Sequence, residues 1–201
     1  MALPFPLQTD NLTPPFTDPR PLPGQPFCLD LVNTRFTDPT GRHDLIDTRA
    51  ALNRWMATSP HLEDYPDLYR FADGYTHTTV RAARDVLAQL LAHPYAPKAL
   101  EPFNTLLSRA RPRREPVLRG IEHRLDTDDP AHLVGYLAAD DYLTLLAECP
   151  DWIRTCENGC GLYFYSRNPR RRRCAHSACG NRVRATRHRL TCTNATSPRR
   201  P

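Results

Sequence analysis

The stretch 156-CENGCGLYFYSRNPRRRRCAHSACGNRVRATRHR-189 decides how the C-terminal end of this chain folds. It holds two close pairs of cysteines in a segment that is otherwise rich in arginine. Each pair can sit on a tight turn, because the neighbouring glycines give the backbone the freedom that such turns need. Two such pairs offer four sulfurs to one tetrahedral Zn²⁺. The predicted ligands are Cys156, Cys160, Cys174 and Cys179.

A closed four-sulfur site leaves no open coordination position, so the predicted zinc is a single structural ion and not a catalytic one. Free thiols or disulfides are the alternative, although clustered cysteines in a reducing compartment are more often metal ligands. His176 could replace a ligand but lies between two better ones, and Cys192 is a weaker spare. A module this small buries little apolar surface, so we expect metal binding to supply its folding energy.

Within the loop between the cysteine pairs, the segment GLYFYSRN (161–168) alternates like a β-strand. Leu162, Phe164 and Ser166 share one face, and Tyr163 and Tyr165 share the other. The aromatic rings have two interpretations. They can cover the small core around the metal, or they can serve as platforms on which bases stack.

Charge is divided unevenly along the 201 residues. Residues 154–201 contain 12 of the 27 basic residues and one of the 22 acidic ones, a net charge of +11, so the rest of the chain carries 15 basic and 21 acidic residues, a net charge of −6. This asymmetry is typical of a protein whose C-terminal end binds nucleic acid while the rest of the chain does not. The alternative is a basic tail that is only solvated. The predicted DNA-facing residues are Arg170, Arg171, Arg172, Arg173, Arg182, Arg184, Arg187, His188 and Arg189.

The segment after the last cysteine, GNRVRATRHRL (180–190), has the spacing of a short basic helix. If the second cysteine pair fixes its N-terminus, this helix can enter a major groove or follow phosphates. Arginine also reads guanine edges. Lys98 is the only lysine of the chain, however, so arginine is preferred over lysine throughout the sequence. The arginines of this segment are therefore weak evidence for base reading. Asn181 could bond the backbone of the second pair or reach a base.

Apolar periodicity predicts a mainly α-helical domain over residues 27–150. Asp44 is the expected N-cap of the second helix, and Pro66 the expected first turn of the third. Segment 112–125 could form a short β-hairpin. The elements expected are a short helix or buried turn at 27–36, a loop at 37–44, and helices at 45–56, 66–93, 97–107 and 130–149. The inward positions expected are Leu45, Leu52, Trp55, Met56, Val80, Ala83, Leu87, Leu90, Leu91, Leu100, Phe103, Leu106, Leu107, Leu133, Val134, Leu137, Leu145 and Leu146.

The chain therefore divides into four predicted segments. Residues 1–26 are rich in proline and carry little periodicity, so we expect an extended arm. The helical domain follows at 27–150, the zinc module at 151–192, and a disordered tail at 193–201. The expected fold class is mainly α, with a small C-terminal four-cysteine zinc-knuckle module that carries the basic helix.

Several classes of function find no support in the sequence. No apolar run approaches the roughly 20 residues that span a bilayer, and the N-terminus has no secretory pattern, so we expect a cytoplasmic protein. We see no glycine-rich phosphate loop, nucleophile elbow or HExxH motif, so we expect no enzyme activity. Asp30 and Asn33 are polar within an apolar stretch and could line a small-molecule pocket. Helix capping and buried hydrogen bonds are the alternative for both.

These motifs resemble the CGNR zinc-finger proteins. The resemblance covers about 35 residues and rests on Cys156, Cys160, Ser166, Arg167, Asn168, Arg171, Arg172, Cys174, Cys179, Gly180, Asn181 and Arg182. CLDLVNT (28–34) and LNRWM (52–56) are similar to the opening motifs of the ABATE domain, which precedes this finger in the family. Two departures stand out. Arg173 replaces the usual Trp, and the first cysteine pair is often one residue wider.

The resemblance implies a bacterial transcription regulator linked to stress, with a DNA-binding finger and a sensory N-terminal domain. It assigns the four cysteines as zinc ligands, and Arg182 with the basic positions after it as the DNA-facing group. We therefore expect a zinc-dependent transcriptional regulator that binds double-stranded DNA, with the N-terminal domain used for sensing a small-molecule effector or for dimerisation. Because one finger offers little contact area, we expect a homodimer. An RNA-binding zinc module, or an enzyme domain that the finger targets to nucleic acid, are the alternatives.

Overall fold

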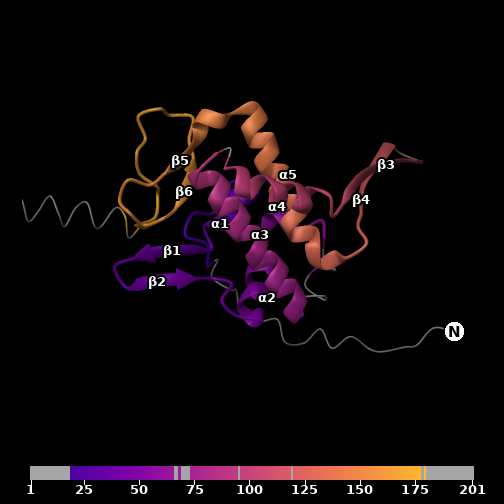
Figure 1. The fold of residues 1–201 in the computed structure, drawn as a ribbon, viewed down its shortest axis with the longest axis horizontal. Helices are drawn as coiled ribbons and strands as arrows, with labels where there is room; N and C mark the ends of the chain where they lie inside the picture. The colour runs from indigo at the N-terminus through magenta and orange to yellow at the C-terminus, as the bar shows by residue number, and fades with distance from the viewer. Residues whose placement is uncertain are drawn as a thin grey trace, which may run out of the picture.

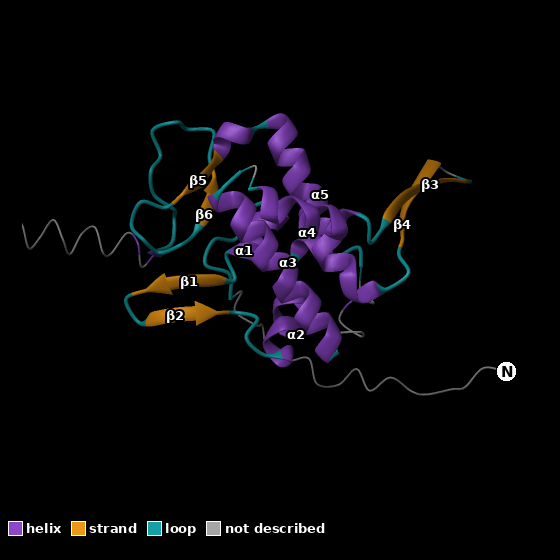
Figure 2. Cartoon of the chain, in the orientation of Figure 1, coloured by secondary structure: helices purple, strands orange, loops and turns teal. Residues whose placement is uncertain are grey.

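The structure is a computed structural model of the chain that describes residues 19–65, 68, 73–94, 96–118, 120–177 and 179, without the side chains of 117 and 121–123. Helices form the centre of the molecule, and three two-stranded antiparallel sheets lie around them (Figures 1 and 2). The mainly α fold class is thereby confirmed.

The helices are α1 (Phe27–Val32), α2 (Arg49–Ala57), α3 (Gly74–Ala92), α4 (Pro97–Leu107) and α5 (Leu133–Glu148). The strand pairs are β1 (Arg35–Asp38) with β2 (Gly41–Asp44), β3 (Arg111–Val117) with β4 (Gly120–Asp126), and β5 (Ile153–Thr155) with β6 (Tyr163–Tyr165).

One apolar core joins the five helices. Every residue of α1 is buried, and α3 contacts α1, α2, α4 and α5. Gly135 lets α5 approach α3 closely, since a Cβ there would lie 3.0 Å from the Cβ of Ala83. The predicted inward residues that are fully buried are Leu52, Trp55, Met56, Val80, Ala83, Leu87, Leu90, Phe103, Leu133, Val134 and Leu145, and those partly buried are Leu45, Leu91, Leu106, Leu107, Leu137 and Leu146.

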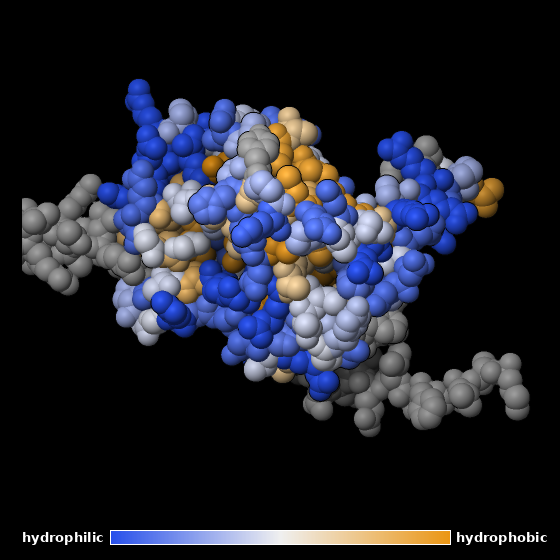
Figure 3. Space-filling view, viewed as in Figure 1, coloured by the Kyte–Doolittle hydropathy of each residue, from blue (hydrophilic) through white to orange (hydrophobic). Residues whose placement is uncertain are grey.

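The prediction for Leu100 was wrong, because its side chain is 42% exposed. Helix α4 buries Ala99 and Phe103 instead. Successive residues of a helix are rotated by about 100°, so a residue next to a buried position turns away from the core. Leu143 of α5 is similarly exposed at 41%, and Figure 3 shows apolar surface over the region of α4 and α5.

Helix α2 begins later than predicted. Its N-cap is Thr48, whose hydroxyl accepts a hydrogen bond from the Ala51 amide at 3.2 Å. Asp44, the predicted cap, ends β2 instead and binds the buried guanidinium of Arg84 at 2.6 and 2.9 Å. A long-range ion pair has therefore taken the carboxylate that the local pattern assigned to the helix.

Residues 37–44 form part of a β-hairpin and not the predicted loop. Strands β1 and β2 pair from Arg35 with Asp44 to Asp38 with Gly41. The Asp38 carboxylate closes the turn by accepting hydrogen bonds from the Thr40 amide at 2.7 Å and the Thr40 hydroxyl at 2.6 Å. An Asp-Pro pair followed by glycine is a turn signature, so the signal for this hairpin is present in the sequence.

The other boundaries follow the proline and capping signals. Helix α4 starts at Pro97, and a 3₁₀ turn at Pro130–His132 leads into α5. The predicted hairpin over 112–125 is present as β3 and β4. It projects from the body at the end away from β5 and β6 (Figure 1). The Asp73 side chain caps α3 by accepting from the Thr76 amide at 2.7 Å, while Pro66, its predicted first turn, lies outside the described residues.

The described end of the proline-rich segment packs against the body. Leu22 is buried, and the buried Arg20 guanidinium binds the Asp30 carboxylate at 2.7 Å. Arg20 also donates to the carbonyl oxygens of Trp55 and Thr58 at 2.8 and 2.9 Å. Residues 19–26 therefore belong to the folded structure, whereas residues 1–18 lie outside the described part of the chain. Within the described residues, none of the helices has the length and apolar character needed to cross a bilayer.

Candidate metal centre and nucleic-acid interface

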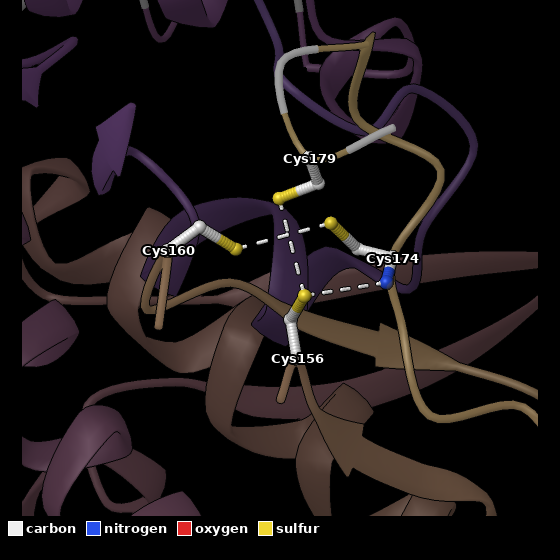
Figure 4. A group of neighbouring side chains, drawn as sticks. All are labelled: Cys156, Cys160, Cys174 and Cys179. Atoms are coloured by element: carbon white, nitrogen blue, oxygen red, sulfur yellow. Dashed lines mark hydrogen bonds between the residues drawn. The ribbon is translucent and has the colours of Figure 1, made fainter. Parts of the chain in front are cut away.

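Four cysteine sulfurs point toward one another beside β5 and β6 (Figure 4). All four side chains are buried, and their sulfurs lie within 4.8 Å of one another. The Sγ atoms of Cys156 and Cys179 are 4.0 Å apart, and those of Cys160 and Cys174 are 3.9 Å apart. A tetrahedral site with Zn–S bonds of about 2.3 Å has sulfur–sulfur edges of about 3.8 Å. The cluster therefore fits one structural Zn²⁺, as predicted.

The first cysteine pair sits on a tight turn that depends on glycine. Gly159 and Gly161 have φ values of 68° and 76°, which other residues adopt only at a cost. The Cys156 amide donates to the Leu162 carbonyl at 2.9 Å, which holds both ends of the turn together. From the second pair, the Cys174 amide donates to the sulfur of Cys156 at 3.4 Å. Such N–H donors stabilise thiolates and orient them toward a metal.

The sulfurs do not behave as four equivalent thiols. A hydrogen bond from Cys174 lowers the pKa of Cys160 to about 5. The same hydrogen bond, together with burial, raises the pKa of Cys174. Burial raises the pKa of Cys179 to about 11. Since zinc binds thiolates, loading the site must displace the protons that the thiols share, and the surrounding arginines offset the negative charge that results.

The metal centre shares a second small core with the N-terminal hairpin. Phe36 of β1 and Leu22 pack with Leu162, Phe164 and the four cysteines. The Thr37 amide donates to the Cys160 carbonyl at 2.9 Å and so fixes the first turn to β1. The zinc module therefore depends on packing from the N-terminal domain as well as on metal. This packing joins residues more than a hundred positions apart, so no local sequence pattern predicts it.

Two amide side chains attach β6 to the N-terminal domain. The Asn33 amide nitrogen donates to the Tyr163 carbonyl, and the Asn33 amide oxygen accepts from the Tyr163 N–H, both at 2.8 Å. The Gln25 amide oxygen accepts from the Tyr165 N–H at 2.7 Å. These contacts pair backbone groups of β6 that its partner strand β5 leaves free.

The Asp30 and Asn33 side chains are both engaged by other residues of the protein. Both are buried, Asp30 by its ion pair with Arg20 and Asn33 by its two bonds to Tyr163. Neither residue belongs to the lining of the cavity beside Val32 and Tyr163 or of the one beside Ser108 and Asp128. These contacts agree with the alternative of buried hydrogen bonds, and the pocket assignment stays a prediction. What sequence reasoning missed is that Asp30 holds Arg20 of the N-terminal segment and that Asn33 holds Tyr163 of the finger, because neither partner is local.

The four arginines before Cys174 divide into two kinds. The Arg171 guanidinium lies 5.0 Å over the Phe164 ring and donates to the Arg173 carbonyl at 3.1 Å, so it holds the loop. Arg172 forms a long ion pair of 3.8 Å with Glu157. Arg170 and Arg173 are exposed, and their guanidiniums have no partner among the described residues. These two are therefore the arginines of this loop that are free to meet phosphate.

The tyrosines of β6 pack against protein. Tyr163 and Tyr165 are partly buried against the main core, and the Tyr165 ring meets Trp152 edge-on at 5.5 Å. His176 meets Phe36 in the same way at 5.4 Å and lies outside the sulfur cluster. These contacts agree with the packing interpretation of the aromatic residues. The predicted basic helix with Asn181, Arg182, Arg184, Arg187, His188 and Arg189, the spare Cys192 and the tail 193–201 lie outside the described residues.

The fold and the sulfur cluster define a helical protein that carries a structural zinc finger. The family described as "Putative stress-induced transcription regulator" (ABATE) matches residues 25–148, and the CGNR zinc finger matches residues 153–190. The chain belongs to the ABATE family and carries a C-terminal CGNR zinc finger. No match emerges among curated proteins. The first match covers the helical body, and the second covers all four zinc ligands.

Proposed function

We propose that this protein is a zinc-dependent, DNA-binding transcriptional regulator. The observation that carries the proposal is the position of Arg170 and Arg173, which are exposed on the loop whose two ends are held by zinc ligands. The metal reduces the freedom of this loop, so less entropy is lost when its arginines contact phosphate. The net charge of +11 over residues 154–201 supports the same proposal.

Gel retardation of duplex DNA tests this proposal. Zinc-loaded protein is expected to retard the duplex, and chelation or Cys179→Ser is expected to abolish the shift. Cys149→Ser is the matched control, because Cys149 lies outside the sulfur cluster. Binding-site selection on random duplexes then shows whether the arginines read bases or only contact phosphates. Equal retardation by the zinc-loaded and metal-free protein contradicts the proposal.

An RNA-binding function needs stacking platforms, and the described tyrosines do not favour it. Tyr163 and Tyr165 are engaged with the main core and Trp152. We therefore place duplex DNA before single-stranded RNA as the partner. Competition between the two for zinc-loaded protein separates the proposals, and a clear preference for the single strand would reverse this order.

We further propose that the regulator acts as a homodimer in the cytoplasm and has no catalytic step. One finger offers a small contact area, and a second copy doubles it. Leu100 on α4 and Leu143 on α5 are exposed apolar side chains on helices that contact each other, and they are our candidates for the contact between copies. Sedimentation should show a dimer that Leu143→Glu dissociates, whereas a monomer at all working concentrations, with and without DNA, argues against it.

A further inference from the structure

A cavity of about 330 Å³ lies where the helical domain meets the zinc finger. One wall comes from the helical domain, with Val32 of α1 and Ala88 of α3. The opposite wall comes from the finger, with Cys160, Gly161 and Tyr163. The cavity volume is in the range of small-ligand sites, and junctions between domains are common positions for such sites.

The lining combines apolar walls with an excess of positive charge. Besides the apolar side chains, it contains Arg35, Arg42, Arg84 and a single carboxylate, Asp85. Arg84 is 1% exposed, so its guanidinium is shielded from bulk water. Its ion pair with Asp44 and the 3.1 Å pair between Arg35 and Asp85 neutralise two of the three cations.

Two donors of this lining make no hydrogen bond within the described residues. Arg42 on β2 is exposed at the rim, and its guanidinium has no partner in the described part of the chain. The Nε–H of Arg84 is buried and makes no hydrogen bond among the described residues, although the Asp85 carboxylate lies 3.8 Å from this nitrogen. An unpaired buried donor is costly, and a ligand oxygen is the kind of group that would satisfy it.

We propose that this cavity binds a small carboxylic acid with an aromatic or branched aliphatic body. The apolar body packs between Val32, Ala88 and the Tyr163 side of the finger, and the carboxylate meets the guanidinium of Arg42. Arginine suits this task because its planar fork matches the two oxygens of a carboxylate. A ligand with charge but no apolar body, such as inorganic phosphate, leaves the apolar walls unused and binds more weakly.

Such a ligand would contact both parts of the protein at once. It would touch Cys160 and Gly161, which form the first turn of the metal centre, together with α1 and α3. Any effect of the ligand on DNA affinity must be matched by an equal effect of DNA on ligand affinity. The regulatory meaning of the site therefore rests on the function proposed above, whereas the binding itself does not.

Calorimetric titration of zinc-loaded full-length protein with benzoate, in the absence of DNA, tests the site. We expect saturable binding, with benzamide and inorganic phosphate each at least about tenfold weaker, since one charge-assisted hydrogen bond is worth roughly that factor. Arg42→Gln is expected to weaken benzoate binding by about tenfold. Arg49→Gln is the matched control, because it removes an exposed arginine of α2 that does not line the cavity.

Ala88→Leu provides a second variant, because its larger side chain extends from α3 into the cavity and should abolish benzoate binding while the zinc content stays at one per chain. Lack of saturable benzoate binding overturns the proposal, and so does equal affinity of the Arg42→Gln variant and the unmodified protein. Because DNA is absent, these outcomes stand whether or not the protein binds DNA.

Discussion

The Asn33 side chain binds both the N–H and the carbonyl of Tyr163, each at 2.8 Å, and so joins the end of α1 to strand β6 of the zinc finger. The side-chain amide of asparagine presents an N–H donor and a C=O acceptor side by side, as the backbone of a neighbouring strand would. Asn33 thus acts as an additional pairing partner for a two-stranded sheet, and such small sheets are marginal by themselves. The finger is consequently built onto the helical domain and is not an independent appendage.

Replacing Asn33 with alanine should destabilise the protein by roughly 2 to 3 kcal/mol, because two buried backbone groups of Tyr163 lose their partners. Urea unfolding of the zinc-loaded protein measures this. Asn104→Ala on the exposed face of α4 is the control and should change the free energy of unfolding by less than about 0.5 kcal/mol. Equal effects of the two variants would show that the Asn33 contact contributes little.

The buried ion pair between Arg84 and Asp44 gives a second prediction. Arg84→Met should cost roughly 3 kcal/mol, because it leaves Asp44 without its bidentate partner. Adding Asp44→Leu to Arg84→Met should recover part of this loss, since an apolar pair can replace an ion pair. Denaturant unfolding of both variants checks the prediction. A double variant that is less stable than Arg84→Met would contradict it.

The same pair predicts a dependence of stability on pH. Burial acts to raise the pKa of Asp44, but the hydrogen bonds and charge of Arg84 outweigh it and hold that pKa below its usual value. A depressed carboxyl pKa stabilises the fold above the unfolded-state pKa of about 3.9, and this contribution is lost as the pH falls through the folded pKa. The difference in unfolding free energy between the unmodified protein and Asp44→Asn should therefore be constant above about pH 5 and shrink in acid. A difference that grows in acid would have the wrong sign.

Loss of zinc should spread into the N-terminal hairpin. Cys174→Ser removes one ligand, and the Thr37 amide, which donates to the Cys160 carbonyl, should then exchange its hydrogen much faster. Native mass spectrometry should find one zinc per chain in the unmodified protein and in the control Cys149→Ser, and none in Cys174→Ser. Unchanged protection of Thr37 in a zinc-free variant would contradict the shared core.

The arginines of the loop should separate into two groups when each is replaced. Arg170→Gln and Arg173→Gln should weaken DNA binding and reduce the salt slope by about one each, because each removes one phosphate contact, without changing stability. Arg171→Gln should instead lower stability, since Arg171 packs on Phe164 and binds a loop carbonyl. Anisotropy across a salt series and thermal unfolding measure the two effects. A salt slope unchanged in Arg170→Gln and Arg173→Gln would rule out their phosphate contacts.

The sequence predicts local features of this molecule well and long-range ones poorly. The zinc ligands follow from cysteine spacing, and the helices follow from apolar periodicity and from Pro97 and Pro130. The hairpin at 35–44 differs from the predicted loop at 37–44, because its short strands lack the apolar alternation typical of a strand, although its Asp-Pro turn has a turn signature. Asp44 was misassigned since its partner, Arg84, lies 40 positions away. The contact of Phe36 with the metal core could not be predicted, because it arises from the folded arrangement of distant segments.

In the proposed function, one zinc ion organises the basic surface that binds DNA. Titration of zinc into metal-free protein mixed with a fluorescent duplex, followed by anisotropy, tests this directly. The anisotropy should rise with added zinc and reach a plateau at one zinc per chain, and high salt should reverse the rise. Full anisotropy before any zinc is added, with no change during the titration, would contradict it.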